Sequence, residues 1–198
     1  MSVLFVWGAA LVIYALFYCW YIGFRKKITP AEVDATMAIF EQRDHIWNQS
    51  QLDNLRSFLL EDDGRDFVMI NLLLFNAPVR ASIDTMGNYQ KVFMGQLLRR
   101  GGHPVLIGRA ASGSFDNVDD SEAGLWHSAA LVRYRSRRDL MEMIPATLGS
   151  EHHDMKLAAL DKTLSFPASP WSMFGGPKVL MPLVLILLAV LGSSFLNG

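Results

Sequence analysis

The charged residues of this chain are confined to its middle. All 18 Lys and Arg and all 19 Asp and Glu lie between Arg25 and Lys178, so residues 1–24 and 179–198 carry no charged side chain. Long uncharged apolar segments can lie in a bilayer, where one charged side chain costs about 3 kcal/mol or more. The pattern therefore predicts two lipid-facing ends around a single water-soluble domain.

The first apolar segment, Val3 to Phe24, has the length of a membrane helix. Its 22 residues would span about 33 Å, compared with about 30 Å for the hydrocarbon core of a bilayer. Trp20 and Tyr21 precede the basic residues 25–27, as is typical where a helix leaves the membrane. The alternative is a cleaved signal peptide, but the segment has no basic start and no small-residue cleavage site. We expect a retained transmembrane helix over residues 1–24.

The second apolar segment, Val179 to Leu196, is slightly shorter. Its 18 residues correspond to about 27 Å of helix. The alternative is an interfacial helix, but the segment has no polar stripe of the kind that such helices carry. We expect a linker over residues 169–178 and a second transmembrane helix over residues 179–198.

Basic residues beside membrane helices indicate orientation, because cytoplasmic flanks carry an excess of Lys and Arg. Arg25, Lys26, Lys27 and Lys178 all flank the central domain, and neither outer tail has a basic residue. We therefore expect an integral protein of the inner (cytoplasmic) membrane, with a cytoplasmic central domain and both termini on the outer side. The formal net charge of −1 gives no indication of nucleic-acid binding.

Two helices are expected in a juxtamembrane segment, residues 25–65. Thr29 followed by Pro30 is typical of a helix start, and this helix is expected to run to Trp47. Ser50 is the expected N-cap of the second helix, which ends before Gly64.

The central segment, residues 66–168, alternates between strand and helix patterns. The expected elements are a strand over Phe67 to Phe75, a helix over Asp84 to Arg100, strands over Val105 to Phe115 and Gly124 to Tyr134, a helix from Ser136 that continues from Ser150 through Leu160, and a strand over Thr163 to Phe166. This β-α-β-β-α-β order is that of a ferredoxin-like α+β domain, with one antiparallel sheet and two helices on one face. Apolar residues remain for the other face, so we expect another sheet to cover it.

Short motifs follow one another along residues 66–168. They are an N-L-L-x-F strand at Asn71 to Phe75, then Tyr89, Gly101-Gly102, Gly108 and Trp126, an R-Y-x-S turn at Arg133 to Ser136, and Ala158-Ala159-Leu160. In this order they resemble a family of uncharacterised dimeric α+β barrel proteins. The chain departs from the family pattern at Arg135, where the family has Pro, and at His127, where it commonly has an acid. The resemblance implies a homodimer whose two sheets meet face to face.

Four polar residues are candidates for binding a ligand in such a barrel: Asn71, His103, His127 and Arg133. Either histidine could act as a base or a haem ligand, and the Asn71 amide could orient a ligand. The alternative for each is an ordinary structural hydrogen bond. We expect no metal site at His152-His153, which would lie at a solvated helix start, because adjacent helical residues point about 100° apart.

A second set of candidates is basic: Arg25, Lys26, Lys27, Arg135, Arg137 and Arg138. They could contact anionic lipid headgroups at the membrane surface or an acidic partner. The alternative is a solvated positive edge balanced by Asp139 and Glu142.

Two functions are consistent with these features. The first is a non-catalytic accessory subunit of a bacterial-type membrane complex, which contacts other subunits through small residues of its helices such as Gly8, Ala189 and Gly192. The alternative is a membrane-anchored small-molecule-binding protein, or a monooxygenase-like or isomerase-like enzyme acting on an apolar ligand. No cofactor is expected for the first function, and haem is an option only for the second. The few polar groups available to a pocket favour the first.

Overall fold

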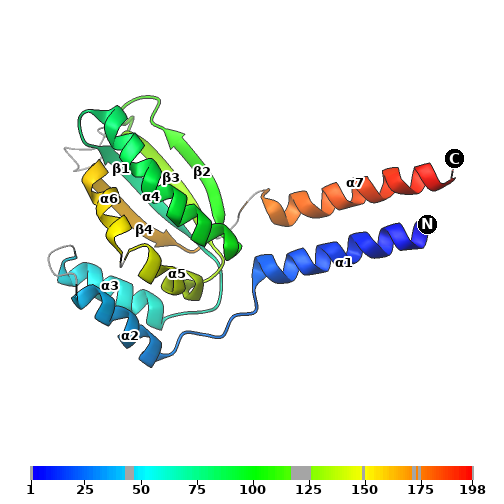
Figure 1. Cartoon of the computed structure of the whole chain (residues 1–198), viewed down its shortest axis with the longest axis horizontal. Helices are drawn as coiled ribbons and strands as arrows, with labels where there is room; N and C mark the ends of the chain where they lie inside the picture. Colours follow the sequence, from blue (N-terminus) through cyan, green and yellow to red (C-terminus); the bar gives the residue numbers. More distant parts are fainter. Residues whose placement is uncertain are drawn as a thin grey trace. The chain divides into compact units, whose positions relative to one another are not determined.

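The computed structural model describes residues 2–42, 47–116, 126–148, 150–170, 173 and 175–197. The chain divides into two compact units, one made of residues 1–24 and 170–198 and the other of residues 25–169 (Figure 1). The first unit thus holds both charge-free ends together with Lys178, and the second unit holds the other charged residues.

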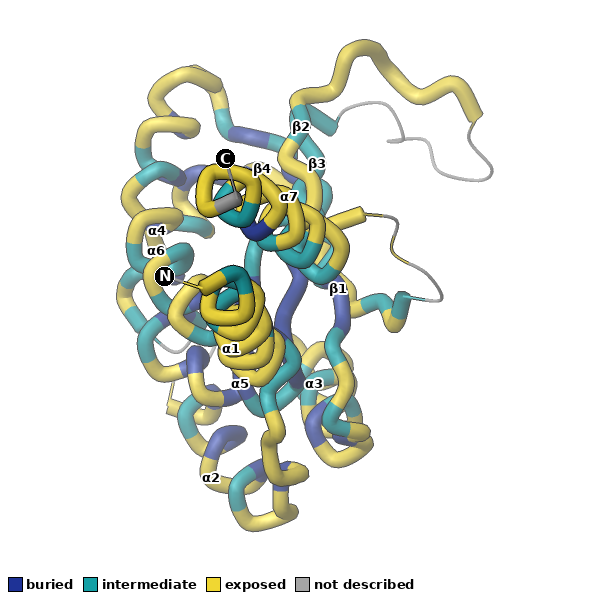
Figure 2. The backbone as a smooth tube through the Cα atoms, turned by 90° about the vertical axis from the view of Figure 1, so that its right-hand side faces the viewer, coloured by how far each residue is buried: buried dark blue, intermediate teal, exposed yellow. Residues whose placement is uncertain are grey.

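The first unit is a pair of helices, α1 (Val3–Ile22) and α7 (Pro177–Asn197), and both are long and apolar enough to span a membrane. Figure 2 shows that most of their surface is exposed. α1 ends two residues earlier than expected because Gly23 has a positive φ of 68°. α7 packs on α1 through small residues: Ala189 is buried, and a Cβ on Gly192 would lie 3.4 Å from Val6 Cγ1.

The second unit is built on one four-stranded antiparallel sheet of order β2-β3-β1-β4. Its strands are β1 (Phe67–Phe75), β2 (His103–Arg109), β3 (Ser128–Tyr134) and β4 (Leu160–Ala168). The prediction of an α+β domain with an antiparallel sheet is confirmed. β2 is shorter than predicted, whereas β4 is longer because it pairs with β1 from Leu160 to Ala168. The predicted start of the strand at Gly124 falls in residues 117–125, which lie outside the described residues.

Helices α4 (Val79–Arg99), α5 (Arg137–Met143) and α6 (Glu151–Ala159) lie over one face of this sheet (Figure 1). A short 3₁₀ turn, Ile144–Ala146, interrupts what the sequence predicted as one continuing helix. Buried side chains of β1 and β3 pack against these helices in two clusters, around Phe67 and Tyr134 and around Leu73 and Phe75. The core therefore lies between the sheet and these three helices.

Two further helices, α2 (Pro30–Glu41) and α3 (Gln49–Leu60), precede the sheet. α2 begins as predicted, with Thr29 as its N-cap. The predicted cap of α3 is wrong: Asn48 accepts a hydrogen bond from Gln51 N, and the Gln51 side chain accepts one from Asn48 N, so Ser50 lies inside the helix. α2 ends at Glu41, before the predicted Trp47, and residues 43–46 lie outside the described residues.

Candidate functional site

A cleft of about 610 Å³ opens between the sheet and helices α3, α4 and α6. The strand registers explain its floor, because side chains of paired residues point to the same face of a sheet. Asn71 of β1 is aligned with Ala130 of β3 and Ser165 of β4, and Met69 is aligned with Val132. All five residues line the cleft. The volume is within the range of ordinary small-molecule pockets.

Buried and exposed residues both line the cleft. Tyr89, Tyr134 and His153 are no more than 7% exposed. Gln51 of α3 and Thr163 of β4 line the cleft as well, and both are exposed. The cleft therefore reaches the protein surface and also extends to side chains that are shielded from water.

Asn71 is the polar centre of the floor. Its Nδ2 donates hydrogen bonds to the carbonyl oxygens of Met69, at 3.2 Å, and Ala130, at 3.1 Å. Its Oδ1 accepts a hydrogen bond of 2.8 Å from Ser165 Oγ. The amide is thereby held in one orientation by three strands, which satisfies a partly buried polar group without a ligand.

Among the described residues that line the cleft, Lys156 of α6 is the one Lys or Arg, and none is Asp or Glu. Burial lowers the pKa of Lys156 from 10.5 to about 8, because a charged ammonium is poorly solvated there. Burial also raises the pKa values of Tyr89 and Tyr134, so both phenols stay neutral. The cleft is thus apolar with a single amine in its wall.

Trp47, which precedes the N-cap of α3, also lines the cleft. Its ring stacks on His153 with centroids 5.5 Å apart and meets the edge of Phe40 at 5.4 Å. Its Nε1 is buried and has no hydrogen-bond partner within the described part of the chain. Buried donors are normally paired, so this one is a candidate contact for a bound molecule.

Of the four residues predicted to bind a ligand, Asn71 lines the cleft and the other three do not. His103 and Arg133 are aligned across β2 and β3 on the opposite face of the sheet. Arg133 is 1% exposed, donates to Asp66 Oδ2 at 2.8 Å and donates to the carbonyl oxygen of Gly101 at 2.9 Å. The Arg133 side chain therefore holds the turn after α4 against the sheet.

His127 has a structural role as well. Its Nδ1 accepts a hydrogen bond of 3.1 Å from Phe75 N, and its backbone N donates to the carbonyl oxygen of Leu73. The ring stacks on Phe75. These contacts hold the residues before β3 in place, and the hydrogen bond from Phe75 N uses the Nδ1 acceptor of His127.

The sequence reasoning missed Lys156, His153 and Trp47. Residues 153, 156 and 157 share one side of a helix by their spacing, and this pattern could have identified His153 and Lys156. The start of α6 was instead interpreted as solvated, whereas His153 is 2% exposed. Among the described residues, no three His, Cys, Asp or Glu side chains gather in a way that could hold a metal ion.

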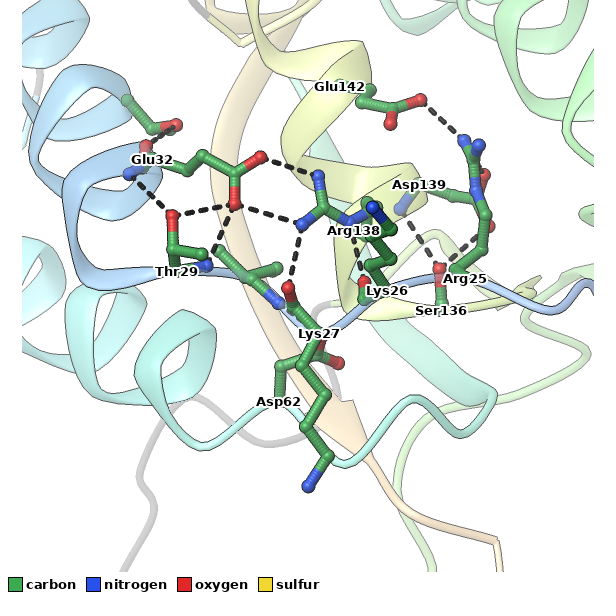
Figure 3. A network of polar contacts seen from close by, with 12 residues as sticks. Arg25, Lys26, Lys27, Thr29, Glu32, Asp62, Ser136, Arg138, Asp139 and Glu142 are labelled. Carbon is green, nitrogen blue, oxygen red and sulfur yellow. Dashed lines mark hydrogen bonds and ion pairs between the residues drawn. The ribbon is translucent and has the colours of Figure 1, made fainter.

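Four of the six predicted surface-contact residues bind other parts of the chain, and two of them, Arg25 and Arg138, do so around the segment after α1 (Figure 3). Arg25 donates to Asp139 at 3.0 Å and to Glu142 at 2.6 Å. Arg138 donates to the carbonyl oxygens of Lys26 and Lys27, at 2.7 and 2.8 Å, and pairs with Glu32. Residues 25–32 are thereby fixed to α5.

The other two arginines also form contacts within the protein, near the start of α5. Arg135 makes a bidentate pair with the buried Asp139, at 2.6 and 2.8 Å. Arg137 donates to the carbonyl oxygen of Phe58 and lies 4.4 Å from the centre of its ring. The side chains of Lys26 and Lys27 are exposed, and neither forms an ion pair within the described chain. These two lysines remain the members of the set that are free to contact a membrane surface.

Comparisons with known proteins indicate the fold of the chain and give no further information about it. No protein-family model and no curated protein matches the chain. A crystal structure of RPA0582, a protein of unknown function from Rhodopseudomonas palustris, is similar with a TM-score of 0.51 and 16% identity, over 64% of this chain and 96% of that one. A structure of methylated RPA0582 is similar with a TM-score of 0.50 and 16% identity, over 65% and 96%. At this identity the likeness shows a shared fold alone.

Proposed function

We propose that this chain is a membrane-anchored protein that binds an apolar small molecule. The cleft of about 610 Å³ carries this proposal, because its lining is mainly apolar and holds a few polar groups at defined places. The alternative function raised by the sequence is therefore better supported than the accessory role. The two histidines predicted as haem ligands do not line the cleft, and the Nδ1 of His127 already accepts a hydrogen bond, so the proposal includes no haem.

The fold proposed for this role is the ferredoxin-like one, related to dimeric α+β barrel proteins. The element order β1-α4-β2-β3-α5-α6-β4 and the strand order β2-β3-β1-β4 support it. The sheet face opposite the cleft carries Leu106 and Leu164, which are 52% and 48% exposed. We propose that a second copy of the chain covers this face. A Leu164→Lys variant that leaves the mass of the particle unchanged in mild detergent would argue against this dimer.

The proposed topology places α1 and α7 across the inner membrane and residues 25–169 in the cytoplasm. Support comes from the two apolar helices and from the basic residues Arg25, Lys26, Lys27 and Lys178 beside them. A reporter fused after residue 198 should behave as exported, and one inserted in the β2–β3 loop as cytoplasmic. The opposite pattern would exclude this orientation.

The accessory role remains a second candidate because of one observation on α1. Phe5, Gly8, Ala9, Val12 and Ile13 line a shallow groove, and a Cβ on Gly8 would meet no atom within 4 Å. A helix of another subunit could approach closely there. Affinity purification from native membranes separates the two roles. Other subunits that co-purify in stoichiometric amounts with the wild type, and are lost with the Gly8→Leu variant, would support the accessory role.

The binding role is tested with the full chain in lipid nanodiscs. We expect Nile red to bind in excess of matched empty nanodiscs. Thr163→Trp places a large ring at an exposed position in the wall of the cleft and should weaken binding by about tenfold. Lys91→Trp is the matched control, since Lys91 is exposed on α4 and does not line the cleft. Equal binding by wild type and Thr163→Trp would contradict the proposal.

A further inference from the structure

Two donors in the wall of the cleft have no acceptor among the described residues. Lys156 Nζ makes no hydrogen bond or ion pair there, although its side chain is only partly exposed. Trp47 Nε1 is buried and also has no hydrogen-bond partner within the described ranges. Both residues line the same cleft. Trp47 stacks on His153, and Lys156 follows His153 by three residues on the same side of α6, so both side chains belong to one part of the wall. An oxygen-rich group of a ligand there would offer acceptors to both donors.

The charge of the lining indicates the sign of that group. Lys156 is the one residue with a formal positive charge in the described lining, and no carboxylate is present to balance it. An isolated ammonium in apolar surroundings is costly, whereas an ammonium paired with an anion and hydrogen-bonded is not. A ligand anion would therefore form an ion pair with Lys156, which has none among the described residues.

The remaining lining indicates the rest of the molecule. Met86, Phe93, Val132 and Leu140 form much of the interior, and each buried methylene group contributes about 0.8 kcal/mol. A single Lys without Arg matches a singly charged group, because phosphate groups are typically held by arginines or several cations. The geometry thus favours a hydrocarbon with one terminal carboxylate.

We propose that the cleft binds an apolar carboxylic acid, whose carboxylate accepts hydrogen bonds from Lys156 Nζ and Trp47 Nε1. This inference rests on the proposed function and specifies its ligand class. The hydrocarbon part lies among the apolar side chains over β1 and β3. Asn71 is a neighbour on the floor, with its amide already bonded to Ala130 and Ser165.

The test compares decanoate with decanol, which differ only in the terminal group. Equilibrium dialysis with the full chain in nanodiscs, corrected with empty nanodiscs, gives both affinities. We expect decanoate to bind about tenfold or more tightly than decanol, the effect of one charge-assisted hydrogen bond. Lys156→Met should remove this preference and keep decanol binding, and Lys156→Arg should retain most of it. Trp47→Phe should weaken the binding of decanoate about three- to tenfold.

The outcomes separate this inference from the proposed function. Equal affinities of wild type for decanoate and decanol would overturn the acid assignment and leave the binding function intact. Decyl phosphate binding more tightly than decanoate would also overturn it. Binding of neither compound above empty nanodiscs would overturn both proposals. Competition by oleate, which stays in the bilayer, or by water-soluble octanoate identifies the source of the acid. Lys91→Met controls for loss of a lysine elsewhere.

Discussion

Ser165 Oγ donates a hydrogen bond of 2.8 Å to Asn71 Oδ1 across β4 and β1, in the floor of the cleft. This bond orients the Asn71 amide so that its Nδ2 faces the carbonyl oxygens of Met69 and Ala130. The most polar point of the floor is thus held by strands that are far apart in the sequence.

The Asn71–Ser165 bond should be measurable as a coupling energy. Asn71→Leu leaves Ser165 without its acceptor, and Ser165→Ala leaves Asn71 Oδ1 without its donor. Each single change should lower the free energy of unfolding by about 1 kcal/mol, and the double variant should cost less than the sum. Urea unfolding of the four proteins gives the cycle. Strict additivity would mean that the bond contributes nothing.

The stability of the protein should rise with pH near the pKa of Lys156. Because this pKa is about 8 in the folded chain and 10.5 ordinarily, the unfolded state binds more protons between these values. His153, Tyr89 and Tyr134 are the other titratable side chains in the lining, and the two phenols stay neutral over this range. Urea unfolding at about pH 7.5 and about pH 9.5 should show the rise. It should disappear in Lys156→Met, and its persistence there would assign it to another group.

Acid should release the segment that follows α1. Hydrogen bonds from Arg138, and then from Thr29, lower the pKa of Glu32 from 4.5 to about 2. The stability contributed by Glu32 is therefore complete above pH 4.5 and is lost as the pH falls toward 2. Arg138→Gln should raise this pKa, measured by carbon NMR of the carboxyl group. A value unchanged from the wild type would show that Arg138 does not hold the carboxylate.

Two glycines of the α4 region should respond in opposite directions to alanine. A Cβ on Gly102 would lie 2.5 Å from Leu97 Cδ1 and 2.8 Å from the Arg133 carbonyl oxygen, so Gly102→Ala should destabilise by about 1–3 kcal/mol. A Cβ on Gly95 meets nothing within 4 Å, and Gly95→Ala should stabilise the helix by about 0.5–1 kcal/mol. The unfolding midpoints of both variants test these two expectations. A Gly102→Ala protein as stable as the wild type would contradict the close packing of Gly102 against Leu97 and Arg133.

Periodicity and capping signals were sufficient for much of the fold. The apolar segment Phe67–Phe75 and the start of α2 at Thr29 and Pro30 were placed correctly, because buried strands and proline starts depend on local sequence. The length of β4 was not predicted correctly. Its exposed residues carry no strand pattern, and its pairing with β1 is set by contacts between residues that are distant in the sequence.

The candidate site was harder to predict. Asn71 was identified because a lone amide interrupts an apolar strand. His103, His127 and Arg133 were chosen as rare polar residues, yet their roles depend on which sheet face and which backbone groups they meet. Lys156 lies in a short polar helix, and its burial follows from how α6 packs on α4, a tertiary contact that a single sequence does not reveal.

The central claim is that the cleft over β1 and β3 binds an apolar molecule. Photocrosslinking with a decyl compound that carries a diazirine, followed by mass spectrometry of the full chain in nanodiscs, tests it most directly. We expect adducts on cleft residues such as Met94 and Leu157, and their loss in Thr163→Trp. Adducts confined to α1 and α7, with the same yield in Thr163→Trp, would contradict the claim.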